Sequence, residues 1–347
     1  MPSLWVTGVA LALALSLPAA GEVDRAVLMA DVAALADDAM EGRGTGTPGA
    51  ARARGLIAGR LSALGLEVEQ ADFAYVHRGG ERTGTNVWAR IEGSAAPDHW
   101  IVVTAHYDHV GVVGGEIHNG ADDNASGVAA LLALAAELRR VPPRHSVLLV
   151  ALDAEEPGLF GASAFVAAPP VPRERILLNV NLDMVSRGDG GELWLVGTGR
   201  HPALAPVLEP LVPRALVPLR LGHDHDGAAD DGDDWTGVSD HAAFDAAGIP
   251  FVYFGVEDHA DYHRPTDDAD RIDPDFFAGA VGTIVAAARM LDAAPEPLAE
   301  ARRAAGGEAV AGATKLKRIT RKRLLALTAA LEGSGAGAAR RAASRRR

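Results

Sequence analysis

The chain has 347 residues, enough for one large α/β domain or two ordinary ones, and its 48% apolar content is ample for a buried core. It contains no cysteine, which excludes thiolate metal sites and disulfide bonds and leaves His, Asp and Glu as possible metal ligands. Residues 301–347 hold thirteen Lys and Arg against Glu308 and Glu332, a net +11; since the whole chain carries −13, the remainder carries −24. An acidic body of this kind disfavours nucleic acid binding and suits cationic substrates.

Residues 1–21 are typical of a secretory signal peptide, with an apolar core and small residues at a plausible cleavage point near Ala20. No Lys or Arg precedes the apolar core, so an uncleaved anchor and a misassigned start are the alternatives. The apolar run is short for a membrane span. We therefore expect an exported protein, periplasmic or secreted, with no stable membrane insertion after cleavage.

The predicted elements alternate between helices and strands along the chain. Such an order implies a mixed, mostly parallel sheet with helices on both faces. We expect a single catalytic domain over residues 22–293. Helices are predicted over residues 24–39, 50–64, 127–140, 158–167, 202–211, 241–247 and 274–292, and strands over residues 67–76, 84–92, 100–106, 146–152, 176–182, 191–196 and 249–255.

The composition changes after Asp292. Residues 294–347 are predicted to be a linker and a basic, largely disordered tail, with a possible basic helix over 315–331. We interpret the tail as a solvated extension, with contact to anionic surfaces as the alternative. The glycine-rich loop over residues 41–49 lacks the Gly-Lys-Ser/Thr ending of a phosphate loop and follows a helix, so it does not indicate nucleotide binding.

Two adjacent carboxylates, Glu155 and Glu156, follow the buried strand predicted over 146–152. They repel each other and are costly to desolvate, which indicates a cation beside them. Ligands of such sheets collect at the carboxyl ends of the strands. Matching side chains follow other strands or lie in polar loops: His106, Asp108, Asp122, Asp123, Asp183 and His263. The set predicts a site for two divalent metals.

Carboxylate oxygens with neutral imidazole suit zinc, and also cobalt or manganese. A dinuclear site needs one bridging carboxylate, terminal ligands for each ion and a free carboxylate as base. Two His, one bridging Asp, one Glu and one further Asp meet this need, and the spare member of Glu155–Glu156 is the base. Asp108, two residues after His106, can hold an imidazole N–H. Taken singly, Asp122–Asn124 could cap a helix and His263 could be an ordinary exposed histidine; their conjunction favours the metal site.

The sequence resembles the zinc-dependent M28 aminopeptidase family from Leu35 to Leu291. Many motifs in the family's order make the resemblance specific. They are Thr104–Asp108, Asn119–Gly127, Asp153–Gly161, Asn181–Met184, Ser239–His241, Ala247–Pro250 and Asp261–Asp268, with the early Glu41–Gly46 and Thr85–Val87.

The resemblance implies a zinc exopeptidase fold, two Zn²⁺ per chain and peptide substrates with a free N-terminus. It implies that Asp123 bridges the ions, that Glu156 and His263 complete one shell, and that His106 and Asp183 complete the other. Glu155 would be the general base, and Asp122 a supporting residue. Tyr262 is the candidate for stabilising the oxyanion, a role that some relatives give to a tyrosine.

Three alternative functions and two alternative roles of single segments stay open. A glutaminyl cyclase shares this fold but uses one zinc; a carboxypeptidase would grip a terminal carboxylate with basic residues such as Arg187 or Arg264; a receptor-like relative would have lost its metals. Ser239–His241 could line the pocket or cap a helix. The acidic loop from His223 to Asp234 could bind calcium, although its spacing does not fit an EF-hand, or be a solvated loop over the pocket entrance.

Overall fold

The computed structural model describes residues 23–224 and 234–306. The predicted signal peptide, the basic tail from residue 307 and most of the acidic loop lie outside these ranges, so those three expectations stay predictions. Eight strands form one sheet in the order β1-β2-β6-β3-β7-β10-β8-β9. They are β1 (Val68–His77), β2 (Gly80–Ile91), β3 (Ala96–His106), β6 (His145–Leu152), β7 (Ile176–Leu182), β8 (Leu193–Val196), β9 (Leu219–Leu221) and β10 (Phe251–Gly255).

The four central strands β6, β3, β7 and β10 are parallel neighbours, and β8 pairs with β9 in parallel. The pairs β1–β2, β2–β6 and β8–β10 are antiparallel. This confirms the mixed, mostly parallel sheet. Because all four central strands run the same way, their carboxyl ends lie along one edge of the sheet, where the candidate ligands follow them.

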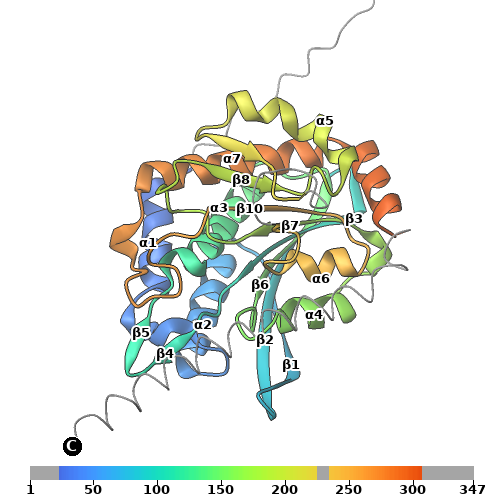
Figure 1. The fold of residues 1–347 in the computed structure, drawn as a ribbon. Coiled ribbons are helices and arrows are strands. Elements are labelled where there is room, and N and C mark those ends of the chain that lie inside the picture. The colour runs from blue at the N-terminus through green and yellow to red at the C-terminus, as the bar shows by residue number, and fades with distance from the viewer. Residues whose placement is uncertain (1–22, 225–233, 307–347) are drawn as a thin grey trace, which may run out of the picture.

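Helices cover both faces of the sheet (Figure 1), because alternate residues of the strands point to opposite sides. In β6, Val147, Leu149 and Ala151 join the larger core under α1, α2, α3 and α7, whereas the residues between them join the smaller core under α4 and α6. The helices are α1 (Arg25–Leu35), α2 (Pro48–Ala63), α3 (Gly127–Arg140), α4 (Phe160–Ala167), α5 (Ala205–Leu208), α6 (His241–Ala246) and α7 (Pro274–Asp292). Helix α7 is long and apolar enough to cross a membrane, but 61% of that stretch is buried inside the domain.

Several elements differ from the prediction. The helix expected over 24–39 ends at Leu35 and is followed by a 3-10 turn over Asp38–Arg43, in which Glu41 and Gly42 have left-handed backbone angles. The helix expected over 202–211 divides into short helical turns because it contains three prolines. The sequence also gave no sign of the three-residue strands β4 (Gly111–Val113), β5 (Glu116–His118) and β9, which are too short for a period-2 pattern.

The folded part extends past the boundary that we expected at residue 293. Residues 295–306 are helical, and Leu298 and Ala301 are buried in the larger core. Arg302 fixes this helix by donating to the backbone carbonyls of Ile176 at 2.8 Å and Gly248. The composition indicated a linker because Pro and Ala are frequent there, but Pro at the start and Ala at buried positions suit a packed helix equally well.

A buried group of hydrogen bonds joins the start of β6 to the end of α7. Asp292 accepts hydrogen bonds from the backbone N–H of Arg144 at 2.7 Å and of His145 at 2.9 Å, and its Oδ1 lies 3.0 Å from His145 Nδ1. Burial alone would raise the pKa of Asp292, but the hydrogen bonds from His145 and the two amides outweigh burial and hold it below its usual value. The ionised carboxylate therefore stabilises the folded chain.

We expect Asp292→Asn to lower the free energy of unfolding at pH 7 by about 1.5–3 kcal/mol, the scale of a hydrogen bond to a charged group. Because the folded pKa is below the unfolded value of about 3.9, the contribution is complete above that pH and is lost as the pH falls through the folded pKa. Urea unfolding between pH 7 and pH 3 should show the difference between variant and wild type shrink. Asp270→Asn, at an 85% exposed side chain, is the control and should change little; an equal loss in both variants would contradict the assignment.

Candidate metal centre

Three neighbouring parallel strands bring the predicted ligands to one edge of the sheet. His106 is the last residue of β3, Asp183 directly follows β7, and Glu155 and Glu156 lie three and four residues after β6. Asp123 lies in the turn over Ala121–Ser126 that leads into α3. The registers pair β3 with both β6 and β7, so the three strand ends are adjacent.

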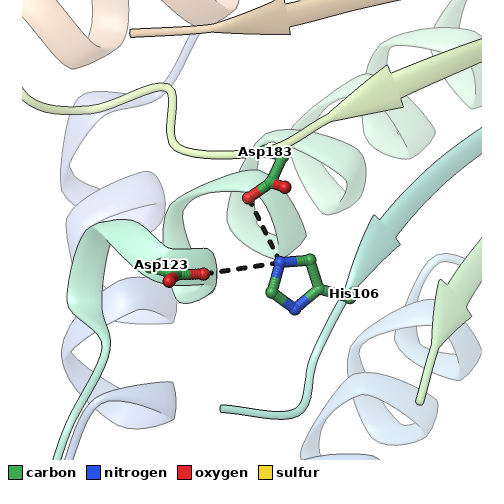
Figure 2. Close-up of side chains that lie close together, drawn as sticks. All are labelled: His106, Asp123 and Asp183. Atoms are coloured by element: carbon green, nitrogen blue, oxygen red, sulfur yellow. Dashed lines mark hydrogen bonds and ion pairs between the residues drawn. The ribbon is translucent and has the colours of Figure 1, made fainter. Parts of the chain in front are cut away.

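His106, Asp123 and Asp183 form the first cluster. The Nε2 atom of His106 lies 3.1 Å from Asp183 Oδ1 and 3.4 Å from Asp123 Oδ1. Figure 2 shows this one nitrogen facing oxygens of both carboxylates, which come from separate elements. All three residues are buried. Their ligand atoms lie within 4.8 Å of one another, close enough to hold a single ion.

His263 and Glu156 meet the same Asp123 from the other side. His263 Nε2 lies 3.0 Å from Asp123 Oδ2 and 3.3 Å from Glu156 Oε2. Asp123 therefore turns one oxygen toward His106 and the other toward His263. The structure brings together all five residues that the sequence proposed as ligands.

Asp108 differs from our expectation. We expected its side chain to hold the imidazole of His106, but the His106 Nδ1 atom lies 3.1 Å from the backbone oxygen of Asp108 and 3.8 Å from the carboxylate. The carboxylate instead accepts the backbone N–H of Glu155 at 3.0 Å and of Glu156 at 3.3 Å. The side chain of Asp108 thus positions the two glutamates, because the tight turn after β6 leaves their amides without strand partners.

Asp122 points away from the cluster, as expected of a supporting residue. Its Oδ1 accepts hydrogen bonds from Ser186 Oγ at 2.6 Å and Ser126 Oγ at 3.1 Å, and its Oδ2 lies 3.2 Å from His259 Nε2. Asp267, which the sequence did not indicate, accepts the backbone N–H of both Asp122 and Asp123 at 3.1 Å. These contacts fix the loop that carries Asp123.

Arg43 is a second residue whose role the sequence did not indicate. It is fully buried, and it donates to the backbone carbonyls of Tyr107 at 2.8 Å, Gly120 at 2.7 Å and Asp123 at 3.4 Å, as well as to those of Leu35 and Asn119. One guanidinium therefore ties the loop after His106 to the loop before Asp123. Burial lowers the pKa of Arg43 to about 10, against the opposing effect of nearby carboxylates, so it stays charged at neutral pH. The Gly-Arg-Gly stretch supplies this cation rather than a nucleotide site.

The two glutamates have different electrostatic surroundings. Burial raises the pKa of Glu155 well above its usual value, and Glu156 adds to this while His106 opposes it. Burial would also raise the pKa of Glu156, but the adjacent His263 and His109 outweigh it and hold that pKa well below its usual value. In return, Glu156 and Asp123 outweigh burial at His263 and raise its pKa to about 11.

These surroundings fit divalent cations. Asp123, Glu156 and Asp183 form ion pairs with imidazoles and with no Lys or Arg of the described ranges. Imidazoles therefore stand at the positions where buried carboxylates require a positive partner. Oxygen and imidazole donors without sulfur are the set that zinc, cobalt or manganese accepts.

The segment Ser239–His241 contacts the strand that leads to Asp183, through Ser239 and Asn181, rather than capping helix α6. Asp240 directly precedes α6, but its side chain makes no capping hydrogen bond. It is fully buried, and neither of its oxygens has a hydrogen-bond partner among the described residues. Burial raises the pKa of Asp240 to about 7, with His106 lowering it and Asp183 raising it. Asp240 is thus a further buried carboxylate whose pKa the charges of His106 and Asp183 affect.

Two other predicted residues have defined surroundings. The ring of Tyr262 stacks on His263 with centroids 4.0 Å apart, so it lies next to the second cluster. Arg187 is engaged by Asp189 at 2.8 Å and by Asp261 at 2.9 Å. Arg264 is exposed. Arg187 is therefore committed to internal carboxylates, which disfavours a role in gripping a substrate carboxylate.

The model of peptidase family M28 matches residues 86–288, which include all five candidate ligands and Glu155. The chain belongs to peptidase family M28. The resemblance inferred from the motifs is thereby confirmed.

Curated relatives match over shorter stretches of this M28 family member. The alkaline phosphatase isozyme conversion protein of Escherichia coli is 29% identical over 43% of this chain and 48% of its own length. Aminopeptidase YwaD of Bacillus subtilis is 40% identical over 24% of this chain and 18% of its own length. The M28 chain therefore spans less than half the length of these relatives.

Solved structures confirm the fold of this M28 domain. A zinc aminopeptidase of Bacillus subtilis has a TM-score of 0.64 at 18% identity, over 78% of this chain and 95% of that one. The glutaminyl cyclase of Fimbriiglobus ruber has a TM-score of 0.64 at 23% identity, over 78% and 96%. Both enzyme types share the fold equally, so the choice between them depends on the site.

Proposed function

We propose that this M28 chain is a metal-dependent aminopeptidase that uses two zinc ions to remove N-terminal residues from peptides. The observation that carries the proposal is the Asp123 carboxylate, whose Oδ1 lies 3.4 Å from His106 and whose Oδ2 lies 3.0 Å from His263. A carboxylate shared by two ligand sets is the requirement of a dinuclear site. Relatives named as zinc metalloproteases and as an aminopeptidase support zinc and peptide hydrolysis.

Each half of the centre supplies ligands for one ion. His106 and Asp183 would hold one, Glu156 and His263 the other, and Asp123 both. When bound, zinc ions polarise a carbonyl and lower the pKa of a water molecule. Cobalt or manganese would suit the same donors.

Glu155 is the general base in this proposal. It takes the proton of the attacking water and delivers it to the leaving amine. Burial and the adjacent Glu156 raise the pKa of Glu155, which makes its carboxylate a stronger base toward the water. Asp108 holds the backbone amides of both glutamates and thereby orients the base. Tyr262, next to His263, would donate a hydrogen bond from its hydroxyl to the carbonyl oxygen of the substrate that becomes negative.

The carboxylates of the centre also favour a free amino group on the substrate. Asp240 is a buried carboxylate with no hydrogen-bond partner among the described residues, so its ionised form would attract an α-ammonium and repel a terminal carboxylate. Arg187 is neutralised by two aspartates, so it offers no counter-charge to a carboxylate. These observations support an aminopeptidase over a carboxypeptidase.

A glutaminyl cyclase is the second candidate, because solved cyclases match this fold as well as aminopeptidases do. A cyclase acts on N-terminal glutamine and needs one zinc. Two complete ligand sets around Asp123 favour the two-metal peptidase.

We expect the purified chain to cleave aminoacyl amides with a free amine and to leave the matched N-acetylated amides intact. Metal analysis of the same sample should give two zinc per chain, and removal of metal by a chelator should abolish cleavage. Cyclisation of a peptide with N-terminal glutamine should be absent. Equal cleavage of free and blocked amides would contradict the aminopeptidase, and cyclisation without cleavage would favour the cyclase.

A further inference from the structure

A third imidazole, His109, lies beside the second cluster without an assigned role. It follows His106 by three residues, and its side chain is fully buried. Neither of its ring nitrogens has a hydrogen-bond partner among the residues that the structure describes. Because burying an unpartnered polar group costs free energy, buried imidazoles normally bind something.

The contacts of His109 match those of a ligand. Its Nδ1 lies 2.7 Å from Glu156 Oε1 and 3.7 Å from Asp123 Oδ2. The shorter distance places Nδ1 in direct contact with the Glu156 carboxylate. His263 meets the same two carboxylates at 3.0 and 3.3 Å. The ligand atoms of His109, Asp123 and Glu156 lie within 4.8 Å of one another, close enough to hold a single ion, and His263 Nε2 contacts the same two carboxylates.

The orientation of the imidazole rings and the neighbouring backbone also fit His109 as a ligand of this ion. The rings of His109 and His263 have centroids 5.6 Å apart and planes at 64°. Two imidazoles on one tetrahedral zinc, with Zn–N about 2.0–2.1 Å, place their centres about 5 Å apart. Gly120, at φ +56°, leaves room for His109, because a Cβ there would lie 2.5 Å from His109 Cδ2. The loop that carries Asp123 is thus shaped around this ring.

We propose that His109 Nδ1 is a fourth protein ligand of the ion held by Asp123, Glu156 and His263. The inference rests on the proposed two-metal function. With His109 as a ligand, the two halves of the centre are unequal. The half with His109 has two imidazoles and two carboxylates, and the half with His106 has three protein ligands. Four protein ligands characterise closed, tight zinc sites, and three leave a position for water. The half with His109 therefore binds its ion more tightly, and the half with His106 keeps the open position.

The test is a titration of the metal-free full chain with Co²⁺, followed by calorimetry and visible absorption. The wild type should bind one ion tightly and a second more weakly. His109→Gln should weaken the tight step by more than about 100-fold, the upper limit for residues that act from outside the ligand shell, and should change the absorption of the first equivalent. His201→Gln, at another buried histidine, whose Nε2 lies 3.8 Å from Asp245 rather than beside the candidate ligands, is the control and should leave both steps unchanged.

Smaller effects decide against the proposal. The proposal is overturned if His109→Gln binds two ions with the affinity and absorption of the wild type. It is also overturned if the affinity of the tight step falls by less than about 100-fold with unchanged absorption, because His109 would then only position Glu156. If the wild type binds a single ion and His109→Gln binds none, the two-metal function is contradicted, but His109 is supported as a ligand. If the wild type binds no ion, the two-metal function and the role of His109 are both overturned. If His109→Gln does not fold, anomalous diffraction from zinc-soaked wild-type crystals decides: Nδ1 within about 2.0–2.1 Å of zinc supports the ligand, and a separation beyond about 3 Å overturns it.

Discussion

Replacing Glu155 with glutamine should lower turnover by at least about 10²-fold, the scale of general-base catalysis. Glutamine has the same shape but cannot take a proton from water. The backbone amide of residue 155 still donates to Asp108, so the turn after β6 should keep its position. Metal content should therefore stay at the wild-type value while kcat falls, measured on an aminoacyl amide with saturating zinc.

The control for this variant is Glu174→Gln, at an exposed position in the turn before β7, which should keep full turnover. Near-normal turnover in Glu155→Gln would show that another group takes the proton. A loss of metal together with turnover would instead assign Glu155 to the ligands.

Replacing Arg43 with methionine should lower the free energy of unfolding by at least about 4 kcal/mol, because unpaired buried polar groups cost about 1–3 kcal/mol each. The substitution leaves carbonyls of five residues without their donor, among them Tyr107 and Gly120. Both loops that carry ligands lose their common anchor, so zinc affinity should fall as well. Urea unfolding of the metal-free chain and zinc titration measure the two effects separately.

Two further variants make the Arg43 prediction specific. Arg43→Lys keeps the charge but has fewer donors and no planar fork, so it should recover only part of the stability. Arg52→Met removes an arginine that pairs with Glu41 at 3.0 Å on the surface and should cost no more than about 1 kcal/mol. Equal effects of Arg43→Met and Arg52→Met would show that the buried hydrogen bonds contribute little.

Three of the five predicted ligands could be found from the sequence because each ends or follows an apolar strand. His106 and Asp183 end or follow apolar strands, and Glu155 and Glu156 follow a third. A strand with an apolar run is recognisable by itself, and parallel strands place their carboxyl ends together. The central strands and the helices α3 and α7 were predicted for the same reason, since their patterns are long and regular.

What the sequence missed depends on partners far along the chain. Arg43 contacts Gly120 across 77 positions, and Asp267 contacts Asp123 across 144. No local pattern distinguishes a buried arginine or aspartate from an exposed one, because burial depends on which loops converge. Asp108 illustrates the same limit: its spacing from His106 was read correctly as close, but only the fold decided that its backbone faces the ring and its carboxylate faces the glutamates.

The sequence by itself determined the family, the order of the main elements and the residues that gather at the edge of the sheet, because these depend on hydrophobic periodicity and on motifs of a few residues. Only the tertiary structure decided that Asp123 faces His106 with one oxygen and His263 with the other, and that His109 lies against Glu156 beside His263. It also decided that residues 295–306 pack on the domain. The reason is physical: the direction of a side chain and the burial of a charge are set by contacts between distant segments, which no single stretch of the chain contains.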